Sequence, residues 1–133
     1  MDQKSETVAF AAAAAAHARK AEEIIGLDLS KVCSYCDGFI ICHGTNRRHV
    51  SAIAEGIIED LKARGVRPLG VEGTEAERWV LIDFGDVIVN VFDPAMRGFY
   101  DLEGIWADAK RLDLKLPSEP VGPTGPFSTT STP

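Results

Sequence analysis

The chain has 133 residues, enough for one domain with a real hydrophobic core, and its 45% hydrophobic and 26% charged residues are typical of a soluble globular protein. Twenty acidic residues against fourteen basic ones give a formal charge of −6, which disfavours non-specific binding to nucleic acid and favours basic partners. No stretch approaches the roughly 18 apolar residues of a membrane span, and the alanine run at 11–16 lacks the basic residues that precede it in a signal peptide. We therefore expect a cytoplasmic protein.

The alanine-rich start of the chain predicts a helix, because alanine is the best helix former. Ser5 or Thr7 can cap this helix, and Gly26 is a natural residue to follow its end. The short alternating segment at 27–30 is typical of an edge strand. Asp37-Gly38 then predicts a turn into a continuous apolar segment at 39–43, which indicates a buried strand.

A second helix is predicted after Asn46, which is a good N-cap, and it ends at Gly65. Its apolar residues fall on one stripe: Val50, Ile53, Ile57 and Leu61. The segment 68–71 is expected to form a strand, and Pro68 places that strand at an edge or marks its start. The order of strand, helix and strand from 39 to 71 indicates a parallel pair with a right-handed crossover.

Two strands separated by Gly85-Asp86 are predicted at 79–84 and 87–92, where β-branched and aromatic residues concentrate. If Phe84 faces Val87, one face of this hairpin is wholly apolar. The other face carries Trp79, Leu81, Asp83, Ile88, Asn90 and Phe92. Because buried polar groups need partners, we expect the apolar face to be core and the mixed face to be at least partly a working surface.

The last third of the chain predicts helices and then a tail. Asp93 is an N-cap followed by a proline at the first helical position, and Asp101 can cap a further helix that places Leu102, Ile105, Trp106 and Ala109 on one side. From residue 117 to 133 the chain is rich in Pro, Gly, Ser and Thr, a composition typical of disorder. The sequence thus divides into a domain at 1–116 and a tail at 117–133.

Cys33, Cys36 and Cys42 are an odd number of cysteines, which suits a reducing compartment. Cys33 and Cys36 form a CxxC, but a zinc site needs a fourth ligand and only His43 lies near Cys42. A reactive dithiol would need a thioredoxin-like setting. We therefore expect small buried or semi-exposed thiols, and no metal.

Two candidate chemical sites can be weighed. The segment 44–49 opens a helix with one glycine and two arginines, so its backbone N–H groups could hold a phosphate, but it lacks the P-loop lysine. Arg47 and Arg48 are better explained as contacts to RNA or a partner, or as a solvated helix end. Asp83, Asp86 and Asp93 do not converge as metal ligands must. No catalytic set or cofactor site is predicted, and the three histidines are assigned structural roles.

Trp79 and Asp83 point the same way on one strand, and a tryptophan beside an acid suits an interface with a basic protein. The alternative is a tryptophan packed under a helix, with the aspartate at the wet margin of the sheet.

The sequence resembles the Iojap-like ribosomal silencing factor family over about residues 7 to 112. The resemblance is carried by segments at 20–25, 27–30, 37–50, 72–73, 79–92 and 97–106, among them DGFIICHGTNRRHV and WVLIDFGDVIVNVF. It implies a single mixed α/β domain with a roughly five-stranded sheet flanked by helices and a topology similar to nucleotidyltransferases, without their catalytic function.

The resemblance also implies that the protein binds the large ribosomal subunit at its intersubunit face, through protein number fourteen of that subunit, and sterically blocks joining of the small subunit when nutrients are short. The binding surface carries over onto residues that match the family pattern: Trp79, Asp83, Phe84, Asp93, Arg97 and Tyr100. Many members have His where this chain has Asn90, so a pH-sensitive or metal role there is not expected. Members can form dimers, and a homodimer would compete with the ribosome for this face.

Two other functions remain open from the sequence. One is a small nucleotide-handling enzyme that uses residues 44–49 and an aspartate. The other is an assembly factor for the large subunit that makes the same contact without blocking subunit joining.

Overall fold

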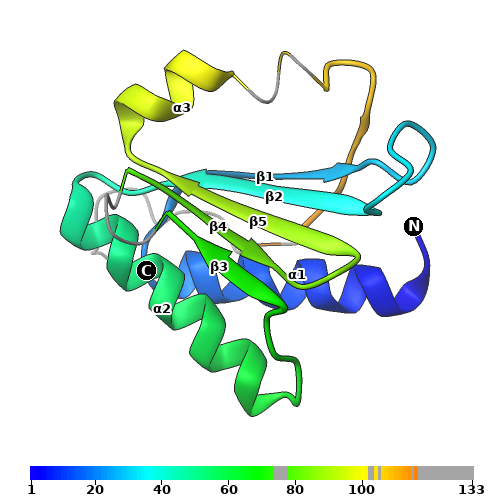
Figure 1. The fold of residues 1–133 in the computed structure, drawn as a ribbon, viewed down its shortest axis with the longest axis horizontal. Coiled ribbons are helices and arrows are strands. Elements are labelled where there is room, and N and C mark those ends of the chain that lie inside the picture. Colours follow the sequence, from blue (N-terminus) through cyan, green and yellow to red (C-terminus); the bar gives the residue numbers. More distant parts are fainter. Residues whose placement is uncertain (74–77, 102–103, 105, 115, 117–133) are drawn as a thin grey trace, which may run out of the picture.

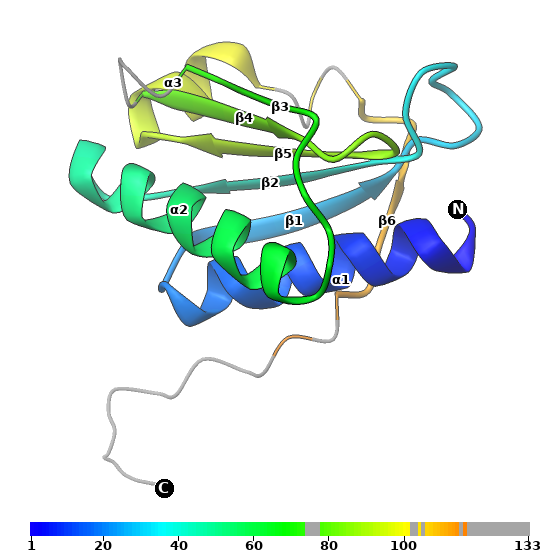
Figure 2. The same cartoon turned by 60° about the horizontal axis from the view of Figure 1, so that its bottom comes forward.

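A six-stranded mixed sheet forms the centre of the protein, with helices α1 and α2 covering one face and the short helix α3 on the other (Figures 1 and 2). The structure is a computed structural model that describes residues 1–73, 78–101, 104, 106–114 and 116. Its elements are α1 (Gln3–Ala18), β1 (Glu22–Asp28), β2 (Gly38–His43), α2 (Arg47–Ala63), β3 (Gly70–Glu72), β4 (Trp79–Asp83), β5 (Val87–Phe92), α3 (Pro94–Tyr100) and β6 (Lys110–Arg111). The predicted mixed α/β fold is confirmed, with six strands instead of about five.

The strand order in the sheet is β3-β4-β5-β2-β1-β6. Strands β2 and β5 pair in parallel at its centre, and every other neighbouring pair is antiparallel. The predicted pairing of the strand after α2 with β2 is wrong, because β4 and β5 lie between β2 and β3. Strand β5 pairs with β2 and with β4, so β3 pairs only with β4 and lies at the edge of the sheet, the position that Pro68 indicated.

The hairpin of β4 and β5 has the predicted register. Asp83 pairs with Ile88, and the Phe84 N–H donates to the Val87 carbonyl at 2.9 Å, so Gly85 and Asp86 form a two-residue turn. Gly85 has φ +95°, the positive value expected at the first position of a type II′ turn. This register sends Val80, Ile82, Val87, Val89 and Val91 to one face, where all are buried.

The start of the chain differs from the prediction. Helix α1 ends at Ala18 rather than near Gly26, and its N-cap is Asp2, whose side chain accepts a hydrogen bond from the Ser5 N–H at 2.8 Å. Residues 22–28 form β1 instead, because pairing with β2 outweighs the helix propensity of this segment. Lys20, with φ +63°, lies between the helix and the strand.

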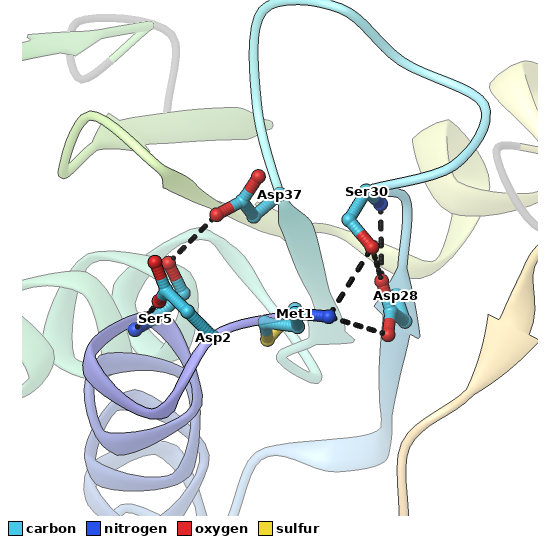
Figure 3. Close-up of polar contacts among 6 residues, drawn as sticks. All are labelled: Met1, Asp2, Ser5, Asp28, Ser30 and Asp37. Carbon is cyan, nitrogen blue, oxygen red and sulfur yellow. Dashed lines mark hydrogen bonds and ion pairs between the residues drawn. The ribbon is translucent and has the colours of Figure 1, made fainter.

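Contacts with distant segments hold the first turn of α1 in place (Figure 3). The Ser5 hydroxyl donates to the Asp37 carboxylate at 2.9 Å, immediately before β2. The Met1 amino group contacts the Asp28 carboxylate at 3.3 Å and the Ser30 hydroxyl at 3.2 Å, at the end of β1. The start of α1 is thereby tied to both ends of the loop at 29–37.

Two hydrophobic clusters lie on opposite faces of the sheet. The larger one joins the sheet to α1 and α2, and it includes the predicted stripe of α2: Val50, Ile53, Ile57 and Leu61. As predicted, Asn46 caps α2 by accepting from the His49 N–H at 2.9 Å, and Gly65, with φ +83°, follows its end. The smaller cluster contains Leu27, Leu29, Cys36, Phe39, Ile41 and Phe92 on the face that α3 partly covers.

The end of the chain is described only in part. Asp93 caps α3 with Pro94 as its first residue, as predicted. Asp101 takes a left-handed conformation at the end of α3, and its carboxylate accepts from the Gly104 N–H at 3.2 Å. Leu102 and Ile105 of the predicted helix, and the predicted tail at 117–133, lie outside the described residues. Among the described helices, none is long and apolar enough to cross a membrane.

Candidate partner-binding surface

The face of the sheet opposite α1 and α2 is only partly covered (Figure 1). Helix α3 has seven residues, whereas α1 and α2 have sixteen and seventeen. Large apolar side chains of this face therefore stay partly exposed, among them Trp79, Leu81, Ile88 and Met96. We call these four, together with Asp83 and Asp93, the outer face. It corresponds to the mixed face that the sequence predicted as a working surface.

Trp79 belongs to the smaller hydrophobic cluster as well as to the outer face. Its ring lies 5.0 Å from that of Phe92, and its indole N–H donates to the Asn90 side-chain oxygen at 3.1 Å. Asn90 is 1% exposed, and within the described residues its side-chain nitrogen has no hydrogen-bond partner. Trp79 is therefore held by packing and by one buried amide, so only part of its ring is available to a partner.

Asp83 and Phe84 lie on opposite faces of the sheet. The Asp83 carboxylate accepts from the Gly85 N–H at 2.7 Å, which stabilises the hairpin turn and leaves a negative charge at the margin of the outer face. Phe84 packs against the larger cluster, beneath the sheet. Of these two predicted residues, the structure therefore places only Asp83 beside Trp79.

Asp93 holds the junction between β5 and α3. One carboxylate oxygen accepts from the Met96 N–H at 2.8 Å, and the other accepts from Arg78 Nε at 3.1 Å. Burial alone would raise the pKa of Asp93, but the Met96 and Arg78 hydrogen bonds and the charges of Arg78 and Arg47 lower it overall. This aspartate therefore stays ionised to a lower pH than an ordinary aspartate, as an N-cap beside a helix N-terminus should.

Arg97, a predicted contact residue, is 7% exposed and points into the protein. Its guanidinium donates to His43 Nδ1 at 2.9 Å and to the Glu22 carbonyl at 3.4 Å. Because a guanidinium has no acceptor, His43 carries its proton on Nε2, which donates to the Glu22 carboxylate at 3.1 Å. Arg97 thus joins α3 to the ends of β1 and β2. Tyr100 is the last residue of α3, and its side chain lies outside the described part.

Arg47 and Arg48 are exposed at the start of α2, beside Ser51, Ala52 and Glu55, which line a shallow open hollow. The N–H of His49 is already bonded to Asn46, while the His49 ring accepts from the Thr45 N–H at 2.9 Å and contacts the Arg19 carbonyl at 2.8 Å. Part of the backbone that a phosphate would use is therefore taken by the cap. His43 and His49 both have structural contacts, as the sequence indicated.

Asp83 and Asp93 lie at opposite ends of the hairpin, because Asp83 ends β4 beside the turn and Asp93 follows the last residue of β5. Across the part of the chain with described positions, no three His, Cys, Asp or Glu side chains are arranged to hold a metal ion. Sequence reasoning missed Arg78 as the partner of Asp93, since the pair forms only when the hairpin closes. It also missed the contact of Arg97 with His43, 54 positions away.

Comparison with known proteins gives a consistent result. The family model described as "Ribosomal silencing factor during starvation" (RsfS) matches residues 2–131. The chain is 41% identical over 114 residues to the ribosomal silencing factor RsfS of Bacillus subtilis, covering 86% of this chain and 95% of that protein. A crystal structure of a Chromobacterium violaceum protein matches with a TM-score of 0.76 and 38% identity, covering 96% of this chain and all of that one. A mouse protein named "Mitochondrial assembly of ribosomal large subunit protein 1" is 30% identical over 89 residues, which cover 65% of this chain and 39% of the mouse protein.

Proposed function

This chain belongs to the RsfS family of ribosomal silencing factors, and from this premise we propose that it binds the large ribosomal subunit at its intersubunit face and sterically blocks the small subunit from joining. Translation is thereby repressed when nutrients are limiting. The contact on the large subunit is protein number fourteen, and no chemical step is required of the bound factor.

The observation that supports this proposal best is the outer face. A sheet whose other face is sealed by two long helices presents Trp79, Leu81, Ile88 and Met96 partly exposed on this side, next to the carboxylate of Asp83. Aromatic and aliphatic side chains supply binding energy when a partner buries them, and an acid beside them selects a basic partner. A net charge of −6 acts in the same direction by steering such a partner toward the protein.

The residues of the proposed surface have different roles. Trp79 and Asp83 contact the partner directly, together with Leu81 between them on β4 and Ile88 opposite Asp83 on β5. Asp93 and Arg97 hold α3 against the sheet and so position Met96, and Tyr100 is a further proposed contact. Arg47 and Arg48 form a separate basic site for a ribosomal RNA or partner contact. An interface of about 1,600 Å² is sufficient for specific association, and its charges predict weakening by salt.

The first experiment is a sucrose-gradient assay with purified subunits, which measures both binding to the large subunit and the fraction of joined ribosomes. The test variant is Asp83→Asn/Ile88→Ala, which keeps an acceptor for the Gly85 N–H while it removes one charge and one partly exposed isoleucine. The control is Glu59→Gln/Ile58→Ala on α2, which removes one charge and one isoleucine from the other side of the sheet, where Glu59 is exposed and Ile58 half-buried. Trp79→Ala is a poorer test because Trp79 also packs on Phe92.

We expect the wild type and the control to travel with the large subunit and to lower the joined fraction equally. The test variant should need about tenfold more protein for the same effect, because it loses about 1.4 kcal/mol or more of contact energy. Failure of the wild type to bind the large subunit would overturn the proposal. If the test variant and the control bind the large subunit and lower the joined fraction equally, the binding site does not lie on the outer face.

A second candidate function is assembly of the large subunit, which the name of the mouse relative favours. It would use the same surface and the same partner. The gradient assay separates the two: an assembly factor binds the large subunit or its precursors without lowering the joined fraction of mature subunits. A homodimer through the outer face is also consistent with its partly apolar character, and it would reduce binding at high protein concentration.

A further inference from the structure

Two cysteines lie together in the loop at 29–37 between β1 and β2. The sulfur atoms of Cys33 and Cys36 are 3.3 Å apart, and both side chains belong to the smaller hydrophobic cluster. The loop is compact: the N–H groups of Val32 and Cys33 both donate to the Leu29 carbonyl, at 3.0 and 2.8 Å, and the Leu29 N–H donates to the Asp37 carbonyl at 2.8 Å. The two thiols are therefore presented to each other by ordered backbone.

The two thiols have different surroundings. Cys33 is half-buried, whereas Cys36 is 4% exposed. Burial of Cys33 acts to raise its pKa, but hydrogen bonds from the backbone of Tyr35, from the Cys36 thiol and from the Cys36 backbone lower it overall. The pKa of Cys36 is raised to about 12, chiefly by burial. The hydrogen bond to Cys33 and the negative charges of Cys33, Asp37 and Asp83 act in the same direction. The thiolate form is thus favoured at the more accessible sulfur relative to an ordinary cysteine, and it is disfavoured at the neighbouring sulfur.

We propose that Cys33 and Cys36 form a redox-active dithiol, in which Cys33 attacks low-molecular-weight disulfides and Cys36 resolves the adduct into an intramolecular disulfide. The geometry carries this assignment: the accessible sulfur lies 3.3 Å from a buried one in a fixed loop. Closing that distance to the about 2.05 Å of a disulfide requires a movement of roughly 1 Å.

The exchange proceeds in two steps. The Cys33 thiolate attacks one sulfur of a disulfide RSSR, so that a Cys33–SR mixed disulfide forms and RS⁻ leaves. The Cys36 thiol then gives its proton to that RS⁻. The resulting Cys36 thiolate attacks Cys33 Sγ and expels the second RS⁻. This second RS⁻ takes up the proton that Cys33 had lost. Two protein thiols are oxidised and one RSSR is reduced to two RSH. Cys33 carries no charge in the mixed disulfide, so its negative charge no longer raises the pKa of Cys36 at the second step.

Cys42 is an internal control for this proposal. It is fully buried near the end of β2, and burial raises its pKa to about 12. A thiol without access and without thiolate character should not react while the protein is folded. Any reagent that modifies all three cysteines equally is therefore reporting unfolding and not the chemistry of the loop.

The experiment exposes the full chain at pH 7 to oxidised glutathione, quenches with acid, alkylates the remaining thiols and maps each cysteine by peptide mass spectrometry. The variants are Cys33→Ser and Cys36→Ser, with circular dichroism as a check on folding. A parallel arm without glutathione measures the rate of alkylation of each thiol by iodoacetamide.

In the wild type we expect the peptide with Cys33 and Cys36 to lose two hydrogens without retaining glutathione. Cys36→Ser should retain one glutathione on Cys33, and Cys33→Ser should remain unmodified. Alkylation of Cys33 should exceed that of Cys36 and Cys42 by at least about tenfold. Alkylation of Cys33 no faster than Cys42, or glutathione retained on Cys33 in the wild type, would overturn the proposal. None of these readouts depends on the ribosome, so the result is independent of the proposed silencing function.

Discussion

Replacement of Arg97 is the most informative test of how the outer face is built. Arg97 was predicted from the family resemblance to contact the partner, yet its side chain is buried and bonded to His43 and the Glu22 carbonyl. Arg97→Met keeps most of the aliphatic volume and removes the guanidinium. If Arg97 acts by fastening α3 to the sheet, the first consequence is a loss of stability and not a loss of contact energy.

The size of the effect follows from the groups left behind. A hydrogen bond from a charged donor contributes about 1.5–3 kcal/mol, and a buried acceptor left without a donor costs about 1–3 kcal/mol. His43 is 7% exposed, so its Nδ1 gains little from water when Arg97 is removed. We therefore expect Arg97→Met to lower the free energy of unfolding by about 3 kcal/mol.

Urea unfolding followed by circular dichroism measures this change, with Arg78→Met as the control. The Arg78 side chain is 45% exposed and pairs with Asp93, so its loss should cost no more than about 1 kcal/mol. The double variant Arg97→Met/His43→Leu removes both partners, and it should recover about 1–2 kcal/mol relative to the sum of the single changes. Equal costs for Arg97→Met and Arg78→Met, together with full additivity, would refute the assignment of Arg97 as a fastening residue.

Three further changes test other parts of the structure. Gly98→Ala should raise the free energy of unfolding by about 0.5–1 kcal/mol, because a Cβ at this exposed position in α3 meets nothing within 4 Å and alanine favours the helix. Gly73→Ala should lower it by more than about 1 kcal/mol, because Gly73 has φ +85° and a Cβ would overlap the Trp79 carbonyl oxygen; thermal unfolding distinguishes the two. Because the pKa of Asp93 is lowered in the folded protein, its ionised carboxylate stabilises the fold above its unfolded pKa of about 3.9. This stabilisation is lost as the pH falls through the folded pKa. The difference in unfolding free energy between wild type and Asp93→Asn should therefore shrink below about pH 4.

The sequence predicts best those elements whose local signals and tertiary environment agree. In α2 the N-cap Asn46, the apolar stripe and the terminal Gly65 all indicate the same helix, and the structure confirms it. The hairpin of β4 and β5 is similar, because β-branched strands flank a turn in which glycine has positive φ. In both cases neighbouring residues determine the outcome, and distant contacts only reinforce it.

The errors occur where a distant segment decides. Residues 22–26 follow a strong helix former and resemble its continuation, but the pairings of Glu22, Ile25 and Gly26 with β2 hold this segment in the sheet. Likewise, β3 was placed beside β2 from the order of elements alone, although β5 occupies that position and β3 lies at the edge of the sheet, beside β4. Single-sequence patterns carry no direct information about which strands become neighbours, so both errors have the same physical origin.

The candidate site was predictable as a face, but the roles of its residues were not. Alternation along β4 correctly separated Trp79 and Asp83 from the apolar side. The same alternation places Phe84 beneath the sheet, against the larger cluster, so the family pattern joins residues from both faces. Burial of Arg97 could not be inferred from the sequence, because its partner His43 is 54 positions away. His43 lies in a segment that was predicted only to be a buried strand.

In the proposed function, the outer face must satisfy two requirements that oppose each other. A surface that binds a partner should expose apolar side chains, yet the same side chains have to be held in place while the partner is absent. Here Trp79 is fixed by Phe92 and by a hydrogen bond to Asn90, and Asp83 is fixed by the Gly85 N–H, so both are ordered before binding. Ordering these groups in the free protein lowers the entropy that binding would otherwise cost. The polar side chains of Asp83 and Asn90 would be unsuited to a fully buried core. Here they give the proposed surface a defined shape, and part of that surface stays exposed for a partner.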